Sequence, residues 1–250
     1  MSESIESAER FTGLAEGYDR YRPRYPAIAV ATILADMRVP ADVVDIGAGT
    51  GISSRALAAT GARVIAIEPN EEMRSVASAS GVDARDGRAD ATGLPDDSAD
   101  VVCAFQAFHW FTEAVTVVEF ARLLRPGGRI ALVWNERDTR GDALTAGVRS
   151  VEKKFGDTEK LAGADFYNDA LVTLLADGGF SRVRRLQFDN EQRLDRDGLL
   201  GRVFSTSFAP RSGPRVAATI EALDDLHARF CDNSGHVTMV YRTTVIIGER

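Results

Sequence analysis

The sequence predicts an α/β fold in which a mostly parallel sheet has helices on both faces. In the first half of the 250-residue chain, apolar runs of strand length alternate with segments whose apolar residues recur at helical spacing. Gly61, Gly81 and Pro126 follow these helical segments, where helices are expected to stop. Repeated alternation of strand and helix indicates parallel strands that are covered on both sides.

The individual elements follow in chain order. Strands are expected at 43–46, 63–68, 82–85, 100–106 and 128–134, and helices at 53–60, 71–80 and 113–124. The second half predicts a helix at 168–176, a strand at 182–188 and a long closing strand at 237–248. Two segments, 136–165 and 190–236, fit this pattern poorly and are interpreted as insertions that wall a substrate site.

Composition and charge limit the classes of partner. With 37 acidic and 30 basic residues, the net charge of −7 supplies no global field for nucleic acid or an anionic membrane. The N-terminal residues are polar and resemble no secretion signal, and apolar runs are too short to span a bilayer. We therefore expect a cytoplasmic protein, a monomer or homodimer, with no nucleic-acid or membrane partner. The three histidines lack metal-ligand spacing, so no metal is expected.

A glycine-rich turn and an acid form the strongest local signal. The stretch "VVDIGAGTG" places Gly47, Gly49 and Gly51 directly after a predicted strand, and Glu68 ends the next one. Glycine permits positive φ and close approach of a ligand to the backbone, while a carboxylate can accept both hydroxyls of a ribose. The pair predicts a nucleoside site at the carboxyl ends of the strands. A dinucleotide fingerprint would need glycine at Ile52, which counts against a nicotinamide oxidoreductase.

Several further stretches strengthen the case for one family. "VIAIEPN", "GRADATGLP", "ADVVCAFQAFHWF" and "LLRPGGRIALVWN" follow the glycine turn in order, and "YDRYRPRYP" precedes it. Together they resemble the motifs of class I S-adenosylmethionine-dependent methyltransferases, most closely the type 11 branch that includes trans-aconitate methyltransferase. The resemblance is clear over 8–134. It implies a Rossmann-like seven-stranded sheet with an antiparallel last strand, a small helical cap made by the insertions, and S-adenosylmethionine as cofactor, leaving as S-adenosylhomocysteine.

The resemblance also implies an organisation for the chain. We expect one methyltransferase domain with an N-terminal lid over the cofactor at 1–26 and a cofactor-binding core at 27–135. The inserted substrate-cap segments are 136–165 and 190–236, and the sheet is completed by 166–189 and 237–250.

Cofactor contacts can be assigned to particular positions. The Asp45 carboxylate and the turn backbone suit the amino and carboxylate groups of a methionyl moiety, and Arg22 suits its carboxylate. By the resemblance, Ala89 and Asp90 lie along the adenine, although Arg88 stands where many relatives carry an acid. The full set of expected cofactor-binding residues is Tyr18, Arg22, Asp45, Gly47, Ala48, Gly49, Thr50, Gly51, Glu68, Pro69, Met73, Ala89, Asp90, Gln106 and Ala107.

The sequence says less about the residues that bind the methyl acceptor. His109 follows the fourth strand into the expected cleft and is the candidate general base, although a histidine there can equally cap a helix. Expected pocket residues are Trp110, Trp134, Tyr167, Phe204 and Phe208. Arg137, Arg140, Arg211 and Arg215 would suit a carboxylate instead, although scattered arginines usually belong to the solvated surface.

The predicted function is therefore methyl transfer to oxygen, nitrogen or carbon of a small-molecule acceptor. In-line displacement at a sulfonium methyl mainly requires alignment of the acceptor and exclusion of water. Two alternatives remain open at this point. The same fold can use S-adenosylmethionine for a reaction other than methylation, or it can bind the cofactor without catalysis.

Overall fold

The computed structural model describes residues 13–111, 113–157 and 169–250. One seven-stranded sheet forms its centre, with the strand order β3-β2-β1-β4-β5-β7-β6. Only β7 runs antiparallel to its neighbours, β5 and β6. The strands are β1 (Asp42–Ile46), β2 (Arg63–Ile67), β3 (Asp83–Arg85), β4 (Ala99–Phe105), β5 (Leu124–Arg137), β6 (Ser181–Leu194) and β7 (Val237–Glu249). The predicted sheet, including its antiparallel last strand, is confirmed.

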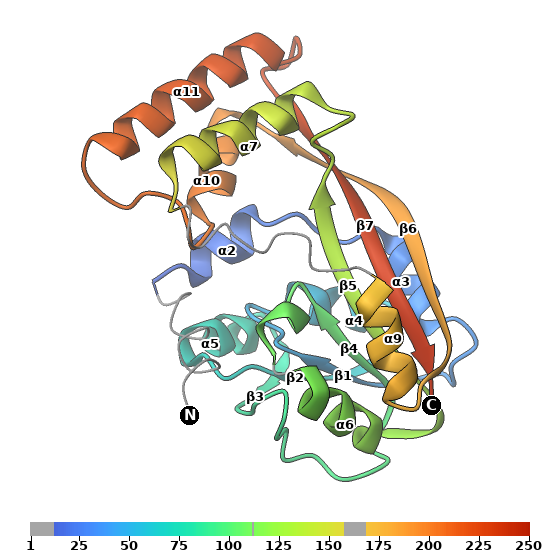
Figure 1. The fold of residues 1–250 in the computed structure, drawn as a ribbon. Coiled ribbons are helices and arrows are strands. Elements are labelled where there is room, and N and C mark those ends of the chain that lie inside the picture. The colour runs from blue at the N-terminus through green and yellow to red at the C-terminus, as the bar shows by residue number, and fades with distance from the viewer. Residues whose placement is uncertain (1–12, 112, 158–168) are drawn as a thin grey trace.

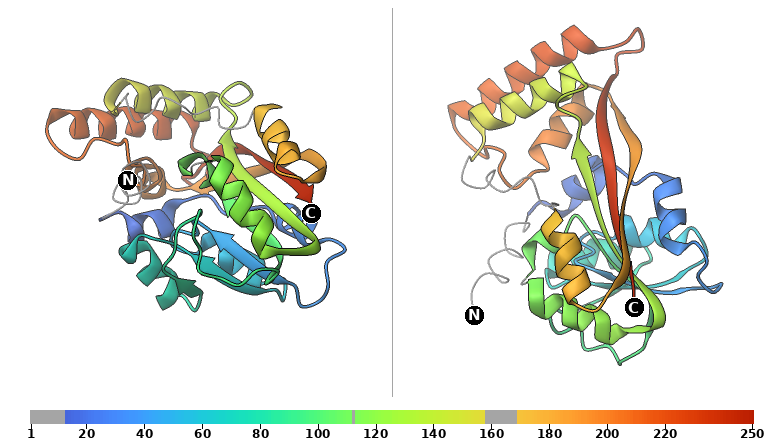
Figure 2. Two further views of the ribbon diagram at one scale, coloured as in Figure 1. Left: turned by 60° about the horizontal axis from the view of Figure 1, so that its bottom comes forward. Right: turned by 45° about the vertical axis from the view of Figure 1, so that its right-hand side comes forward.

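Helices cover both faces of the sheet, as Figure 2 shows from the side. Consecutive strand residues point to opposite faces, so Val43 and Val44 of β1 belong to different hydrophobic clusters. Val43 packs with α3 (Ala27–Leu34) and α4 (Ile52–Ala58). Val44 packs with α6 (Glu113–Leu123) and α9 (Asp169–Asp177). The helix α5 (Glu71–Ala79) lies beside β3 and begins at Asn70, whose side chain accepts the Met73 N–H.

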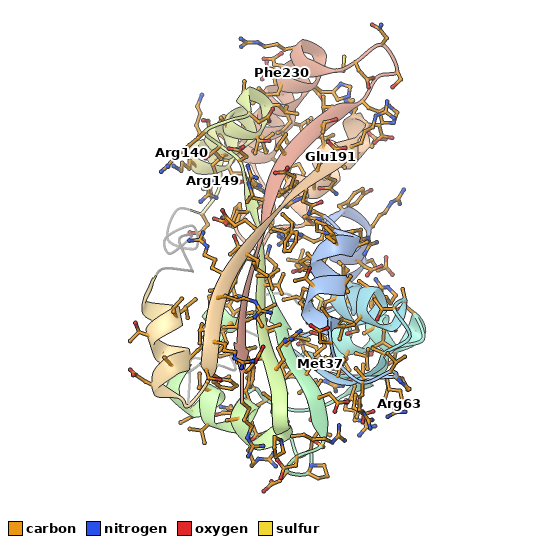
Figure 3. All side chains as sticks on the ribbon, turned by 90° about the vertical axis from the view of Figure 1, so that its right-hand side faces the viewer. Met37, Arg63, Arg140, Arg149, Glu191 and Phe230 are labelled. Carbon is orange, nitrogen blue, oxygen red and sulfur yellow. The ribbon has the colours of Figure 1, made fainter. Side chains whose placement is uncertain are left out.

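A third cluster builds a cap beyond the carboxyl end of β5. The helices α7 (Ala143–Phe155), α10 (Arg196–Phe204) and α11 (Pro214–Phe230) pack on the extended ends of β6 and β7. Figure 1 shows this cap at one end of the molecule, with α2 (Ala15–Tyr21) between α10 and α5. Phe230 and Arg149 mark the cap in Figure 3, whereas Met37 and Arg63 mark the opposite end.

The last strands are longer than expected. β5 continues to Arg137 rather than 134, and β6 continues to Leu194 rather than 188. Both pair with the long β7, up to Arg137 opposite Tyr241 and Leu194 opposite Val237. The first residues of both expected insertions are thus strand residues, because β7 supplies a partner that a local pattern cannot reveal. The rest of the first insertion beyond residue 157, and residues 1–12 of the expected lid, lie outside the described residues.

Across the three described ranges, no helix combines the length and the apolar character that crossing a membrane requires.

We predict that α6 stabilises the sheet mainly through Phe120. Its side chain is fully buried, whereas Val118 on the same helix is 68% exposed. Phe120→Ala should lower the free energy of unfolding by about 3–5 kcal/mol, because it removes a large core side chain and leaves a cavity. Val118→Ala, the matched control, should change it by less than about 0.5 kcal/mol. Urea unfolding followed by circular dichroism measures both, and equal effects would contradict this packing.

Candidate functional site

The glycine turn joins β1 to α4, and its three glycines have different surroundings. Gly47, Gly49 and Gly51 have φ of 69°, 57° and 79°, a region that side chains other than glycine rarely adopt. A Cβ on Gly47 would lie 2.6 Å from Ala107 Cβ, and one on Gly51 would lie 3.0 Å from Val82 Cγ2. A Cβ on Gly49 would meet no protein atom within 4 Å. Packing therefore requires the outer two glycines, whereas Gly49 leaves its side of the turn open to a ligand.

Glu68 lies against this turn from the end of β2. Its Oε2 accepts the Gly49 N–H at 2.8 Å, and its Oε1 accepts the Asn70 N–H at 2.8 Å. The residue is 8% exposed, and burial raises the pKa of its carboxyl, opposed by the hydrogen bonds from Asn70 and Gly49. Each carboxylate oxygen has a second lone pair for another donor. The two oxygens thus suit the two hydroxyls of a ribose.

A cavity opens in front of the turn and Glu68. It contains about 880 Å³ of empty space, part of it open to solvent. Its walls come from the N-terminal segment, the glycine turn, and the ends of β2, β4 and β5. The lining residues are Tyr18, Arg22, Pro23, Tyr25, Gly47, Ala48, Gly49, Ile52, Ser53, Glu68, Pro69, Met73, Phe105, Gln106, Ala107, Trp110, Phe111 and Asn135.

The lid segment, residues 15–26, supplies one wall of the cavity. The guanidinium carbon of Arg22 lies 4.4 Å from the centroid of the Tyr18 ring. The Tyr25 ring meets Phe105 at the end of β4 edge to face, with the centroids 4.7 Å apart. The cavity therefore has a carboxylate, Glu68, in one wall and a cation, Arg22, in another.

Amide side chains from distant strands hold the lid segment in place. Gln192 Nε2 donates to the Tyr21 carbonyl at 2.9 Å. Asn190 Nδ2 and Asn135 Nδ2 donate to the Arg24 carbonyl at 2.9 and 3.2 Å. Sequence reasoning missed these amides; only Asn135 carried a signal, because it directly follows a predicted strand.

Asp45 acts behind the turn rather than in the cavity. It is fully buried, and its Oδ2 accepts hydrogen bonds from Ser53 Oγ and Ser54 Oγ, both at 2.6 Å. Burial raises the pKa of the Asp45 carboxyl, opposed by those two hydroxyls and by Cys103. Asp45 is not among the residues that line the cavity. Asp45 instead fixes the first turn of α4, from which Ser53 lines the cavity.

His109 lies in the short 3-10 helix η1 (Phe108–Trp110) and does not line the cavity. Its Nδ1 accepts the Trp134 indole N–H at 3.3 Å. Burial, assisted by the charge of Arg22, lowers the pKa of His109 to about 4. The ring is therefore neutral at pH 7 with hydrogen on Nε2, and its Nδ1 lone pair is already used. The residue that the sequence suggested as a general base thus directs its Nδ1 at Trp134.

Most of the other predicted cofactor residues meet at the cavity, and four do not. Thr50 and Gly51 lie in the turn but do not line the cavity. Ala89 and Asp90, which follow β3, do not line it either. Both oxygens of Asp90 accept hydrogen bonds from Arg88 at 2.9 Å, which explains why this carboxylate is not turned toward a ligand. That ion pair forms because arginine occupies position 88.

The predicted acceptor pocket is brought together only in part. Trp110 lines the cavity, but Trp134 is buried in the core, where its indole bonds to His109. Phe204 and Phe208 are half-buried in the cap region and do not line the cavity. Tyr167 lies outside the described residues.

The residues of this cavity fit an adenosyl compound with an amino-acid tail. The open side of Gly49 admits a ligand next to Glu68, whose two oxygens match vicinal hydroxyls. Pro69 and Met73 offer apolar surface beside it, and Arg22 offers a charge for a carboxylate.

Comparisons with known proteins agree with this reading of the site. Residues 44–132 match the family model described as "Methyltransferase domain". An uncharacterized methyltransferase of Mycobacterium tuberculosis is 42% identical over 135 residues, which cover 52% of this chain and 54% of that protein. The match thus spans about half the length of that relative.

Two further similarities extend over the whole chain. An uncharacterized methyltransferase-like protein of Schizosaccharomyces pombe is 29% identical over 259 residues, covering 100% of this chain and 98% of that protein. The crystal structure of the YcgJ protein of Bacillus subtilis has a TM-score of 0.56 at 21% identity, covering 89% of this chain and 96% of that one. The latter similarity supports the fold. We conclude that residues 44–132 of this chain form part of a methyltransferase domain.

Proposed function

We propose that this protein transfers the methyl group of S-adenosylmethionine to oxygen, nitrogen or carbon of a small-molecule acceptor. The observation that carries the proposal is the buried Glu68 carboxylate, bonded to the Gly49 N–H and lining a cavity that also contains Arg22. This arrangement supplies acceptors for a ribose and a cation for a carboxylate at opposite parts of one site. The methyltransferase domain family supports the same cofactor.

The cofactor, when bound, supplies an electrophilic methyl group on a sulfonium. The protein's part is then to hold the adenosyl and methionyl parts and to align an acceptor. Glu68 would bind the ribose hydroxyls and Arg22 the methionyl carboxylate, while Ser53 and the turn backbone line the space between them. Alignment in a closed site contributes up to roughly 7–11 kcal/mol to lowering a barrier.

The lid segment covers one side of this site. Tyr18 and Arg22 cover the cavity from α2 and its end, and the hydrogen bonds from Asn135, Asn190 and Gln192 fix that position. Because His109 is neutral and its Nδ1 is bonded to Trp134, we assign it to holding Trp134 beside the cavity wall rather than to removing a proton.

Product analysis tests the proposal directly. Incubating the protein with S-adenosylmethionine and a pool of small acceptors should yield S-adenosylhomocysteine together with a product heavier by one CH₂ unit, detected by mass spectrometry. S-adenosylmethionine consumed without a methylated product would favour a non-methylation reaction. Binding without consumption would favour a non-catalytic domain.

We predict that Glu68→Gln weakens the binding of S-adenosylhomocysteine. The amide retains one acceptor oxygen but places an NH₂ group against the Gly49 or Asn70 N–H, so at least one charge-assisted hydrogen bond is lost. The dissociation constant should rise about 10- to 100-fold, as expected for loss of about 1.5–3 kcal/mol. Isothermal titration calorimetry measures the change. Glu71→Gln, an exposed carboxylate three residues along the chain, should bind as the parent protein does.

A second prediction concerns the pH dependence of stability. The pKa of His109 falls from 6.5 to about 4 in the fold, so the unfolded chain binds more protons between those values. Stability should therefore fall as pH drops from 6.5 toward 4, by up to roughly 3 kcal/mol from this residue. His109→Asn keeps an acceptor for the Trp134 indole and should remove that part of the slope in urea unfolding. His227→Asn, in the cap helix α11, is the control, and an unchanged slope in His109→Asn would contradict the assignment.

A further inference from the structure

A buried arginine lies where the cap meets the lid segment. Arg202 on α10 is 4% exposed, and its Nε donates to Tyr241 Oη on β7 at 3.1 Å. Its Nη1 is buried and has no hydrogen-bond partner. Buried donors on charged groups are nearly always paired, so this unpaired nitrogen requires an explanation.

The surrounding charges do not balance Arg202. Glu152, its acidic neighbour, is already held by both terminal nitrogens of Arg137 and lies 3.5 Å from Arg149 Nη1. Burial lowers the pKa of Arg202 to about 10; the charges of Arg137 and Arg22 contribute, while Tyr241 acts against them. The guanidinium therefore remains charged at neutral pH, with cations around it.

Arg22, in the lid segment, also has a buried guanidinium nitrogen that lacks a hydrogen-bond partner among the described residues. Its Nε is buried without a hydrogen-bond partner, and its guanidinium stacks on the Tyr18 ring while lining the cavity. Each arginine thus keeps one buried nitrogen without a hydrogen-bond partner among the described residues, which a bound anion would satisfy.

Direct contacts connect Arg202 to the lid segment. Tyr241 Oη, which accepts from Arg202, donates to Gln192 Oε1 at 3.2 Å, and Gln192 Nε2 donates to the Tyr21 carbonyl. Gly201, next to Arg202, packs so closely on the lid that an added Cβ would lie 2.5 Å from the Tyr21 ring. Arg202 thus lies on the seam between α10 and α2. Its chain neighbour Gly201 packs on Tyr21, which directly precedes the cavity-lining Arg22.

We propose that Arg202 binds a carboxylate of the methyl acceptor at the seam between α10 and α2. The inference rests on the proposed methyltransferase function. The bound carboxylate anchors the acceptor and is not the methylated group, because Arg202 does not line the cavity in front of the glycine turn. The Arg202 guanidinium offers N–H donors that a carboxylate accepts, while Arg22 is left for the carboxylate of the cofactor.

This assignment differs from the arginines that the sequence suggested. Arg137 is taken by Glu152, and Arg211 donates to the carbonyls of Phe204 and Thr206. Arg140 and Arg215 are exposed. Arg202 carried no sequence signal, because its distinguishing feature is an unpaired nitrogen inside the fold.

The test uses the full chain loaded with S-adenosylhomocysteine and titrates it with benzoate and succinate, each beside its neutral amide, benzamide and succinamide. We expect the carboxylates to bind at least about tenfold more tightly than the amides, and Arg202→Met to remove that preference. Arg196→Met on the same helix, where the arginine is half-exposed and paired with Asp224, should keep it. Equal binding of carboxylate and amide by the parent protein would overturn the proposal, as would an undiminished preference in Arg202→Met.

Thermal unfolding provides a readout that a purely structural arginine would not give. Because Arg202 is buried with an unpaired nitrogen, Arg202→Met should leave the melting temperature unchanged or raise it while carboxylate binding is lost. A lower melting temperature with carboxylate binding intact would assign Arg202 to packing alone. If Arg202→Met does not fold, Arg202→Lys keeps the charge without the planar fork and should bind the carboxylates with an intermediate preference.

A second arm identifies the source of the carboxylate. S-adenosylhomocysteine and methylthioadenosine share the nucleoside, but only the former has an amino-acid tail. Arg202→Met should bind both as the parent protein does. If it weakens S-adenosylhomocysteine alone, the carboxylate belongs to the cofactor and the acceptor assignment is overturned. Failure of the parent protein to bind either compound would instead refute the proposed methyltransferase function.

Discussion

The hydrogen bonds of the Glu68 carboxylate hold together the ends of two parallel strands, and the site depends on them. One oxygen fixes the turn after β1 at Gly49, and the other fixes the chain at Asn70. Asn70 in turn caps α5 by accepting the Met73 N–H at 2.9 Å. The ligand-binding acid, the glycine turn and the start of α5 are therefore one hydrogen-bonded unit. Burial raises the pKa of Glu68, so the fold bears the cost of keeping an acid there, which is typical of a functional site.

A second buried acid keeps the other side of the turn in place. Asp45 faces the side of the sheet that α4 covers, and it binds the Ser53 and Ser54 hydroxyls at the start of that helix. The turn is thus fixed from α4 by Asp45 and from β2 by Glu68. Gly47 and Gly51 add close packing against Ala107 and Val82, so only the Gly49 side remains open. Rigid supports around one open position match what a preorganised binding site requires.

The sequence predicts the first five strands and the cofactor turn because their signals are local. Alternation of apolar runs, the glycine spacing and Glu68 all lie within short windows around β1 and β2. The contacts of the lid segment join residues that are far apart in the sequence. Gln192 lies 171 residues from Tyr21, and Asn190 lies 166 residues from Arg24. The state of a titratable group is equally hidden, since the Trp134 indole that occupies His109 Nδ1 is 25 residues away. Position 88 shows the opposite case, since Arg88 is visible in the sequence as a departure from the family pattern, and the structure pairs it with Asp90.

The lid segment contacts both the cavity and the cap. Residues of β6 and α10 hold the Tyr21 carbonyl and ring, and these elements belong to the cap rather than to the cofactor-binding half. Movement of α2 away from α5 would therefore break contacts with Gln192 and Gly201 as well as uncover the cavity. The Tyr18 and Arg22 side chains, which line the cavity, belong to this same segment. The position of this wall of the cavity therefore depends on contacts that β6 and α10 make with the lid segment.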